Sequence, residues 1–304
     1  MISDFDYHRP VHVAEAVALR HRLGAGATYW AGGTDLLLQC KRGRAVTHCI
    51  DLTGLAELAR VERQAAGIRI GALVPLSGLE RFSAIDPYLR TIAETAGRMC
   101  TVQTRTLATI GGNLCNASPS ADLAVVLTAL GAVARVEGPK GRRDIPLDRF
   151  ATAPGRTVLE PPELLTNVFV PLPDIPRASA YHRVARTVVD IALVGAAASV
   201  ELEPDGRTIG AVRIALGAVG PRVLRAGRAE EMLRGQGVSS LGDAELLTRI
   251  GAAATGAATP ISDIRASASY RGAMVPVLVR RCLSAIAMDL EAQAHPPQPR
   301  ETDR

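Results

Sequence analysis

Hydrophobic and polar positions alternate along the first half of the chain with two periods, one typical of helices and one typical of strands. Between residues 12 and 23 the apolar residues gather near one helical face, and Gly24 and Gly26 follow as turn residues. Between residues 67 and 73 apolar residues recur at every second position, as in a half-buried strand. The pattern predicts helices at 12–23, 76–85, 88–99 and 122–130, and strands at 5–7, 28–31, 48–52, 67–73, 133–136 and 164–170.

The pattern changes after a proline-bearing linker at 171–176. Two β-rich segments, 191–201 and 208–219, are separated by the turn sequence Pro204-Asp205-Gly206, which predicts an antiparallel hairpin. Helical patterns then follow at 229–234, 243–257 and 270–290. We therefore expect a first domain over residues 1–175 with subdomains at about 1–55 and 56–175, a second, smaller domain over 178–290, and a flexible tail over 291–304.

Composition indicates a folded protein with no nucleic-acid partner. Of the 304 residues, 47% are hydrophobic, which is enough for a substantial core. The net charge is +5, and Lys and Arg are interleaved with acidic residues rather than gathered in a stripe. Aromatic residues make up only 3% of the chain, too few for a platform on which bases stack. A basic groove for an anionic cofactor fits the same charge balance.

Cysteine usage and the start of the chain favour a cytoplasmic protein. The five cysteines form no CxxC pair and no zinc-type spacing, and their odd number argues against a disulfide framework. Residues 1–9 lack the basic and apolar regions of a secretory signal, and no apolar run reaches the roughly 18 to 20 residues of a membrane span. Membrane association would therefore need partner subunits.

Two short glycine-bearing segments carry the strongest chemical signal. Residues 31–35 read AGGTD and residues 109–113 read TIGGN, so each places glycines beside a hydroxyl residue. Glycine lets backbone N–H groups approach a diphosphate closely, and the hydroxyl adds a donor. Either segment alone is better explained as an ordinary turn, and together they predict a dinucleotide cradle. A Rossmann site is disfavoured, because Tyr29 occupies the third glycine position of a GxGxxG motif that Gly24 and Gly26 would begin.

Further motifs beside the second loop and later in the chain make the pattern specific to one protein family. The second loop is preceded by Gln103-Thr104-Arg105 and followed by the sequence ASPSAD at 117–122, and Tyr181, Arg186 and Asp190-Ile191-Ala192 come later. With these motifs in this order, the chain closely resembles the FAD-binding medium subunits of the molybdenum hydroxylases, the family of xanthine dehydrogenase and carbon monoxide dehydrogenase. The resemblance covers the chain to about residue 290.

The resemblance implies an α+β fold. The first domain would be a two-subdomain FAD-binding domain of the vanillyl-alcohol-oxidase (PCMH) type, not a Rossmann domain. The second domain would combine a three-stranded antiparallel sheet with a helical bundle.

The resemblance also implies a function within a complex. A large molybdopterin-binding subunit would oxidise the substrate, and a small subunit with [2Fe-2S] clusters would relay electrons to the FAD of this chain. The FAD would pass them to an acceptor such as NAD or a quinone, in a dimer of heterotrimers. The sequence shows no HExxH motif, candidate triad or metal cluster, so we predict no catalytic residue and no metal ion in this chain.

Site residues follow from the same resemblance. The two glycine loops would wrap the diphosphate, Asp122 would accept from a ribitol or ribose hydroxyl, and Leu165 would pack near the flavin ring. Residues 183–193 would border the reactive side of the ring. The predicted cofactor-binding residues are Trp30, Ala31, Gly32, Gly33, Thr34, Asp35, Leu36, Ala108, Thr109, Gly111, Gly112, Asn113, Asp122, Leu165, His182, Arg183 and Ile191.

Alternatives remain open for individual residues. Asp122 could cap the helix that follows it, Leu165 could be plain core, and Arg186 with Asp190 could form a surface ion pair. Arg183 stands where medium subunits commonly have lysine. A planar guanidinium therefore takes the place of an ammonium group. Ile191 stands where some members place an aromatic residue over the flavin, so an aliphatic cover is expected.

Alternatives also remain for the whole protein. A stand-alone FAD-dependent oxidoreductase of the same fold would need its own acid or base, and in some cases a histidine or cysteine linked to the flavin. None of the six histidines adjoins the first glycine loop, which disfavours such a link. A scaffold that has lost its flavin is disfavoured because both glycine loops are intact.

Overall fold

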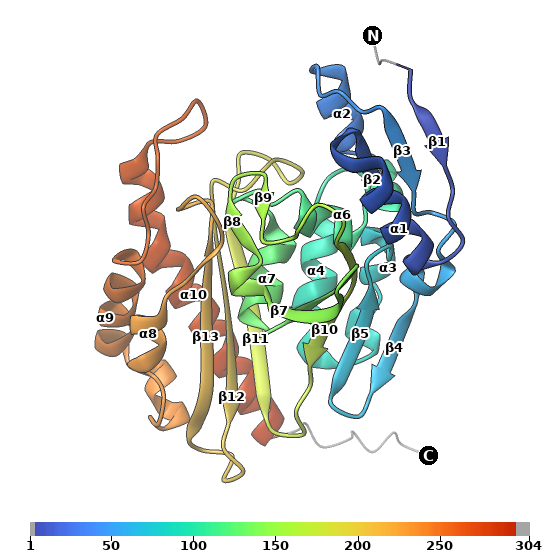
Figure 1. Cartoon of the computed structure of the whole chain (residues 1–304). Coiled ribbons are helices and arrows are strands. Elements are labelled where there is room, and N and C mark those ends of the chain that lie inside the picture. The colour runs from blue at the N-terminus through green and yellow to red at the C-terminus, as the bar shows by residue number, and fades with distance from the viewer. Residues whose placement is uncertain (1–3, 296–304) are drawn as a thin grey trace, which may run out of the picture.

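The computed structural model describes residues 4–295, which fold into a row of sheets with helices between and beside them (Figure 1). Residues 296–304 of the predicted tail and the first three residues lie outside the described part. In the described part, the last helix continues to Ala294, through residues 291–294. That part also contains no helix that is both long and apolar enough to span a membrane.

The chain begins with a small parallel sheet whose strand order is β1-β3-β2. Helix α1 packs on it because Val13, Ala16 and Val17 recur on one face and meet Ile50 of the sheet in a separate small core. The predicted helix at 12–23 and the strands at 5–7, 28–31 and 48–52 are confirmed within a few residues. The elements are β1 (Asp6–His8), α1 (Val13–Leu23), β2 (Ala27–Trp30), α2 (Leu36–Lys41) and β3 (His48–Asp51).

A five-stranded antiparallel sheet, ordered β4-β5-β10-β6-β7, forms the middle of the molecule. Short helices cover the face that turns toward the C-terminal sheet (Figure 1). The elements are β4 (Val61–Gln64), β5 (Gly67–Gly71), α3 (Leu76–Leu79), α4 (Arg90–Arg98), α5 (Val102–Leu107), α6 (Ile110–Cys115), α7 (Asp122–Ala129), β6 (Val133–Gly138), β7 (Gly141–Pro146), β8 (Ala151–Ala153), β9 (Arg156–Thr157) and β10 (Leu164–Pro171).

The C-terminal part holds an antiparallel sheet ordered β11-β12-β13-β14, with helices on its outer face (Figure 1). Three of its strands are long, as expected, and the fourth has only two residues. The predicted hairpin is confirmed by the antiparallel pairing of β12 with β13. The elements are β11 (Arg177–Val184), β12 (Val194–Leu202), β13 (Ile209–Gly217), β14 (Leu224–Arg225), α8 (Gly227–Glu231), α9 (Ala244–Thr255) and α10 (Ala268–Ala294).

Two predicted elements differ in the structure. The helix expected at 76–85 ends as α3 at Leu79, and a 3-10 turn follows at Phe82–Ala84, because Gly78 weakens so short a helix. The strand expected from residue 191 begins at Val194, and residues 185–193 form a loop instead. The second difference lies at the pocket described below, whose lining includes residues 185–188.

Helices α4 and α7 lie between the middle sheet and the C-terminal sheet, so both sheets share one core. Buried hydroxyl groups fix this contact. Ser199 on β12 donates to the carbonyl of Ala129 (2.6 Å), and Thr91 on α4 donates to the carbonyl of Ser179 on β11 (3.0 Å). The end of α7 is therefore tied to β12, and the start of α4 to β11.

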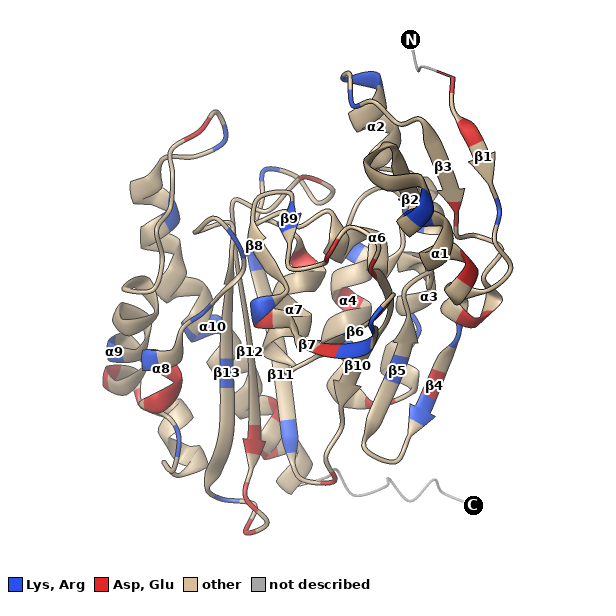
Figure 2. Cartoon of the chain, viewed as in Figure 1, with Lys and Arg blue, Asp and Glu red and all other residues tan. Residues whose placement is uncertain are grey.

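Charged residues of both signs are distributed over most elements (Figure 2). Many of them pair across neighbouring elements, as Arg143 does with Glu163 (2.7 Å) and Arg90 with Asp289. All five cysteines are free thiols. The fold is therefore held by its shared apolar cores rather than by disulfide bonds.

Candidate cofactor site

The first glycine loop lies directly against the segment that leads into the second. A side chain on Gly32 would place its Cβ 1.7 Å from the carbonyl oxygen of Leu107, so only glycine fits at this contact. Gly33 has a φ of +68°, and its Cβ would come within 2.7 Å of Trp30 Nε1. A Cβ on Gly111 would likewise stand 2.7 Å from the carbonyl oxygen of Ala72. Gly32 thus brings the first loop against residues 107 and 108, which lead into the second loop, while Gly33 and Gly111 are required by other close contacts.

The first loop exposes a run of unpaired backbone donors. Within residues 4–295, none of the amides of residues 32–36 donates a hydrogen bond to a protein acceptor. Leu37 is the first residue after them whose amide is used, and it donates to the carbonyl of Gly33 (2.9 Å). Consecutive free N–H groups around a glycine pair form a concavity suited to an anion.

The second loop has a different role. Thr109 caps α6 by accepting from the amide of Gly112 (3.0 Å), and the amides of Ile110 and Gly111 donate to carbonyls of residues 74 and 72. These donors are largely used inside the protein. The buried amide oxygen of Asn113, in contrast, has no partner in the described part. The second loop is therefore a rigid wall for the first, with one polar atom left for a ligand.

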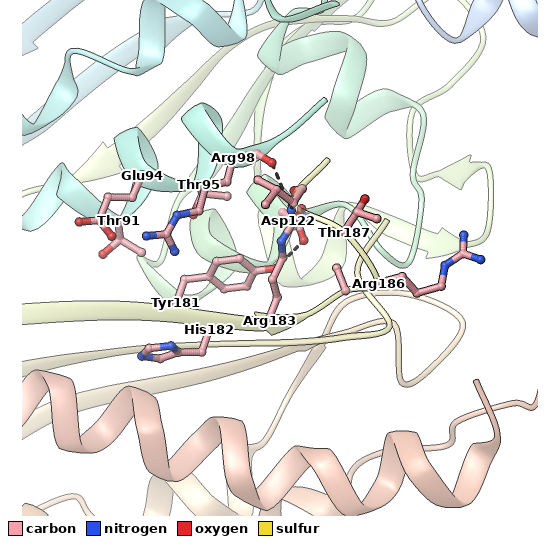
Figure 3. A pocket seen from close by; sticks show the side chains of 12 residues that line it. Thr91, Glu94, Thr95, Arg98, Asp122, Tyr181, His182, Arg183, Arg186 and Thr187 are labelled. Atoms are coloured by element: carbon pink, nitrogen blue, oxygen red, sulfur yellow. Dashed lines mark hydrogen bonds and ion pairs between the residues drawn. The ribbon is translucent and has the colours of Figure 1, made fainter. Parts of the chain in front are cut away.

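Asp122 does not cap α7. The N-cap residue of this helix is Ala121, and the Asp122 carboxylate turns toward β11, where it accepts from the Tyr181 hydroxyl and from Arg183 Nη1 (2.5 Å) (Figure 3). Its side chain is only 7% exposed. The alternative of a helix cap is thereby excluded, and Asp122 belongs to a buried polar cluster.

This cluster and the first loop border one region. Burial raises the pKa of the Cys100 thiol, and the nearby carboxylates of Asp35 and Asp122 raise it further, while Arg105 and Arg183 lower it. Groups from the first loop and from the cluster therefore act on one thiol. We refer to the first loop together with the pocket described next as the cleft. Partial burial also raises the pKa of Asp35 itself.

A pocket of about 520 Å³ opens between α4 and β11 (Figure 3). Asp122, Tyr181, His182 and Arg183 contribute to its wall. One side is formed by the polar face of α4, and another by the loop after β11. The remaining lining residues are Thr91, Glu94, Thr95, Arg98, Ala185, Arg186, Thr187 and Val188.

Burial and neighbouring charge oppose each other in this pocket. Burial raises the pKa of Asp122, whereas the charge of Arg183 and the hydrogen bonds from Tyr181 and Arg183 lower it. Burial raises the pKa of Tyr181 well above its usual value, and the Asp122 carboxylate raises it further. The tyrosine therefore remains a hydroxyl donor across the physiological range.

Other predicted residues have distinct positions. His182 is half-buried in the pocket wall, and burial together with Arg281 and Arg98 lowers its pKa, so its imidazole is neutral at pH 7. Ile191 is 48% exposed on the loop after β11. Leu165 is buried in β10 and belongs to the main apolar core. Arg186 and Asp190 form an ion pair (2.6 Å), as the alternative for these two residues had it.

Sequence reasoning overlooked the polar face of α4. Thr91, Thr95 and Arg98 are spaced by four and three residues, so they share one side of the helix, and all three line the pocket. That spacing was visible in the sequence. Tyr181 was recognised as part of a motif but not as a site residue, because its contact with Asp122 depends on the register of β11.

Two family models match the chain. The family described as "FAD binding domain in molybdopterin dehydrogenase" matches residues 3–173, and the family described as "CO dehydrogenase flavoprotein C-terminal domain" matches residues 179–286. The chain therefore belongs to the FAD-binding medium subunits of the molybdenum hydroxylase family, as its motifs predicted.

Individual relatives agree with this assignment. The chain is 33% identical to the carbon monoxide dehydrogenase medium chain of Hydrogenophaga pseudoflava, with 92% of this chain and 96% of the relative covered. It is 30% identical to the xanthine dehydrogenase FAD-binding subunit of Escherichia coli O157:H7, covering 93% and 96%. A solved carbon monoxide dehydrogenase structure from Hydrogenophaga pseudoflava superposes with a TM-score of 0.88 at 32% identity, covering 95% and 99%.

Proposed function

We propose that this chain is the electron outlet of a molybdenum hydroxylase complex. It would hold FAD between the [2Fe-2S] clusters of a small subunit and an external acceptor such as NAD or a quinone, while a large molybdopterin-binding subunit oxidises the substrate. We place this complex in the cytoplasm, as a dimer of heterotrimers. Family membership supports the cofactor, and the free amides of residues 32–36 are the observation that carries its placement.

The residues of the cleft have separable tasks in this proposal. The amides of the first loop donate to the diphosphate, and the packing of Gly32 on Leu107 keeps that loop in place. Asp122 accepts from a sugar or ribitol hydroxyl, and Arg183 balances its charge. FAD, when bound, supplies the redox chemistry that links single-electron donors to the acceptor. The chain itself binds, orients and shields.

The proposal is tested by flavin content. The chain, co-expressed with its partner subunits, should purify with stoichiometric FAD that acid releases. Gly32→Ala should reduce the retained FAD by about tenfold or more, because the displaced loop loses charge-assisted hydrogen bonds to the diphosphate. Gly272→Ala on α10 is the matched control, because its Cβ would meet no atom within 4 Å.

The outcomes separate the proposals. A colourless complex that takes up no FAD would overturn the assignment. Equal flavin content in Gly32→Ala and the wild type would leave FAD in the protein but remove the first loop as its cradle. Turnover of a substrate by the chain without partner subunits would favour a stand-alone flavoenzyme.

A further inference from the structure

Arg183 makes an unusual set of contacts at the end of β11. Its Nη1 atom donates to Asp122 (2.5 Å) and to the carbonyl of Asp190 (3.2 Å). Its Nη2 atom donates to the carbonyl of Arg98 (3.1 Å) and to that of Val188. All four hydrogens on these two nitrogens are thereby used, and the side chain is only 13% exposed.

These acceptors belong to three separate segments. Asp122 begins α7, Arg98 ends α4, and the other two carbonyls belong to the loop of residues 185–193. A lysine ammonium has three donors on one atom, so it cannot span acceptors that lie on both sides of a planar fork. The contact set depends on arginine and not only on positive charge.

The loop has few other attachments to the cleft. Its C-terminal base is held firmly: the amide of Leu193 donates to Val184 (2.8 Å), its carbonyl accepts from Arg271 Nη1 (2.8 Å), and its side chain is buried. Its ion pair between Arg186 and Asp190 lies on the surface, with Arg186 57% exposed. Val188 is 74% exposed, so apolar packing does not hold the tip. Beyond that base, the two bonds from Arg183 to the carbonyls of Val188 and Asp190 are therefore the inward connection of the loop.

We propose that Arg183 is a positioning residue that fastens the loop of residues 185–193 to the wall of the pocket. The loop supplies four of the pocket's lining residues, from Ala185 to Val188. Fastening it sets how far the pocket opens. This last step rests on the proposed function, since an electron acceptor would reach the bound cofactor past this loop.

Amide hydrogen exchange of the purified complex tests the fastening. The amides of Asp190 and Ile191 are bonded within the loop, so they report its opening. Arg183→Lys should accelerate exchange of a peptide covering the loop by about tenfold or more. Arg186→Lys, a matched change in the same loop, should alter it by less than about twofold. A peptide covering β12 should be unchanged.

The double variant with Arg183→Gln and Asp122→Asn provides a second measurement without an unpaired buried charge, and should show the same loop acceleration. Unchanged loop exchange in both variants would overturn the proposal, as would equal acceleration of the loop and β12. Exchange is measured before and after removal of flavin, so that a change in loop opening can be distinguished from a change in flavin content. With flavin bound, iodide should quench its fluorescence more strongly in Arg183→Lys; unchanged quenching would refute control of access.

Discussion

At the scale of single residues, the cleft is organised around the carboxylate of Asp122. One oxygen accepts from Tyr181 and the other from Arg183, and the residue is only 5% exposed. A buried ion pair adds little net stability, because desolvation offsets the attraction, although removing one partner costs about 3–5 kcal/mol. The cluster therefore serves orientation: it fixes where a carboxylate oxygen points.

Tyr181→Phe tests this orientation. Loss of the hydroxyl frees one carboxylate oxygen, so we expect FAD affinity to fall about tenfold, the worth of one charge-assisted hydrogen bond. The pKa of Asp122 should also rise, since the Tyr181 hydrogen bond lowers it. Protonation then removes the acceptor at low pH, so the loss should be larger at about pH 5.5 than at about pH 8. Fluorescence titration with FAD at both pH values measures it.

Asp122→Asn supplies the control for that variant. If Tyr181 acts through Asp122, its removal in the Asp122→Asn background should change FAD affinity by less than about twofold. An equal loss in both backgrounds would show that the tyrosine acts by packing alone. A double-mutant cycle therefore separates the two roles.

At the scale of elements, the β12–β13 hairpin depends on one turn carboxylate. Asp205 accepts from the hydroxyl of Thr208 (2.6 Å) and from the amides of Arg207 (2.8 Å) and Thr208 (2.9 Å), while Gly206 takes a φ of +66°. The Thr208 hydroxyl bond and these amide bonds lower the pKa of Asp205 to about 2. The turn is thus closed by its own side chain.

The lowered pKa of Asp205 makes the stability of the fold depend on pH in one definite direction. A depressed carboxylate pKa stabilises the fold above the unfolded value of 3.8, and the contribution disappears as pH falls toward about 2. NMR titration should place the Asp205 midpoint near the lower value. Thr208→Val should move this midpoint upward, because it removes the hydroxyl hydrogen bond that lowers the pKa of Asp205 most. A midpoint near 3.8 in the wild type would contradict the turn geometry.

Dense runs of apolar residues made several elements predictable, and two of the elements that sequence patterns missed are built largely from small residues. Helix α7 and strand β10 stand out because their apolar residues form dense runs. Strand β11 was missed because its buried face consists of Ala178 and Ala180, which give little contrast with the linker before it. Helix α6 was missed because Gly111 and Gly112 disfavour helix, and the cap from Thr109 compensates locally.

The site was predictable to the level of motifs. The glycine loops and Asp122 follow from short segments whose chemistry is local. The contacts of Arg183 with Asp122 and Arg98 do not, because they depend on how three segments that are distant in the sequence pack. Sequence separation of 85 residues between Arg98 and Arg183 carries no periodic signal. Long-range hydrogen bonds therefore needed the structure.

At the scale of the whole molecule, the cleft is assembled from parts that share a core. Ala197 of β12 and Ala215 of β13 pack with the helices of the middle sheet, so the C-terminal sheet cannot shift without disturbing α7 (Figure 1). The start of α7 and the end of β11 are thereby held together at the pocket. The fold's contribution is to fix the Asp122 carboxylate and to leave the backbone donors of the first loop free.

Amide hydrogen exchange with and without FAD tests the central claim most directly. If residues 32–36 form the cradle, FAD should slow exchange in a peptide covering them by about tenfold or more, since their amides gain acceptors. A peptide covering α8 should not change. FAD binding without protection of residues 32–36, or with protection confined to other segments, would contradict the account.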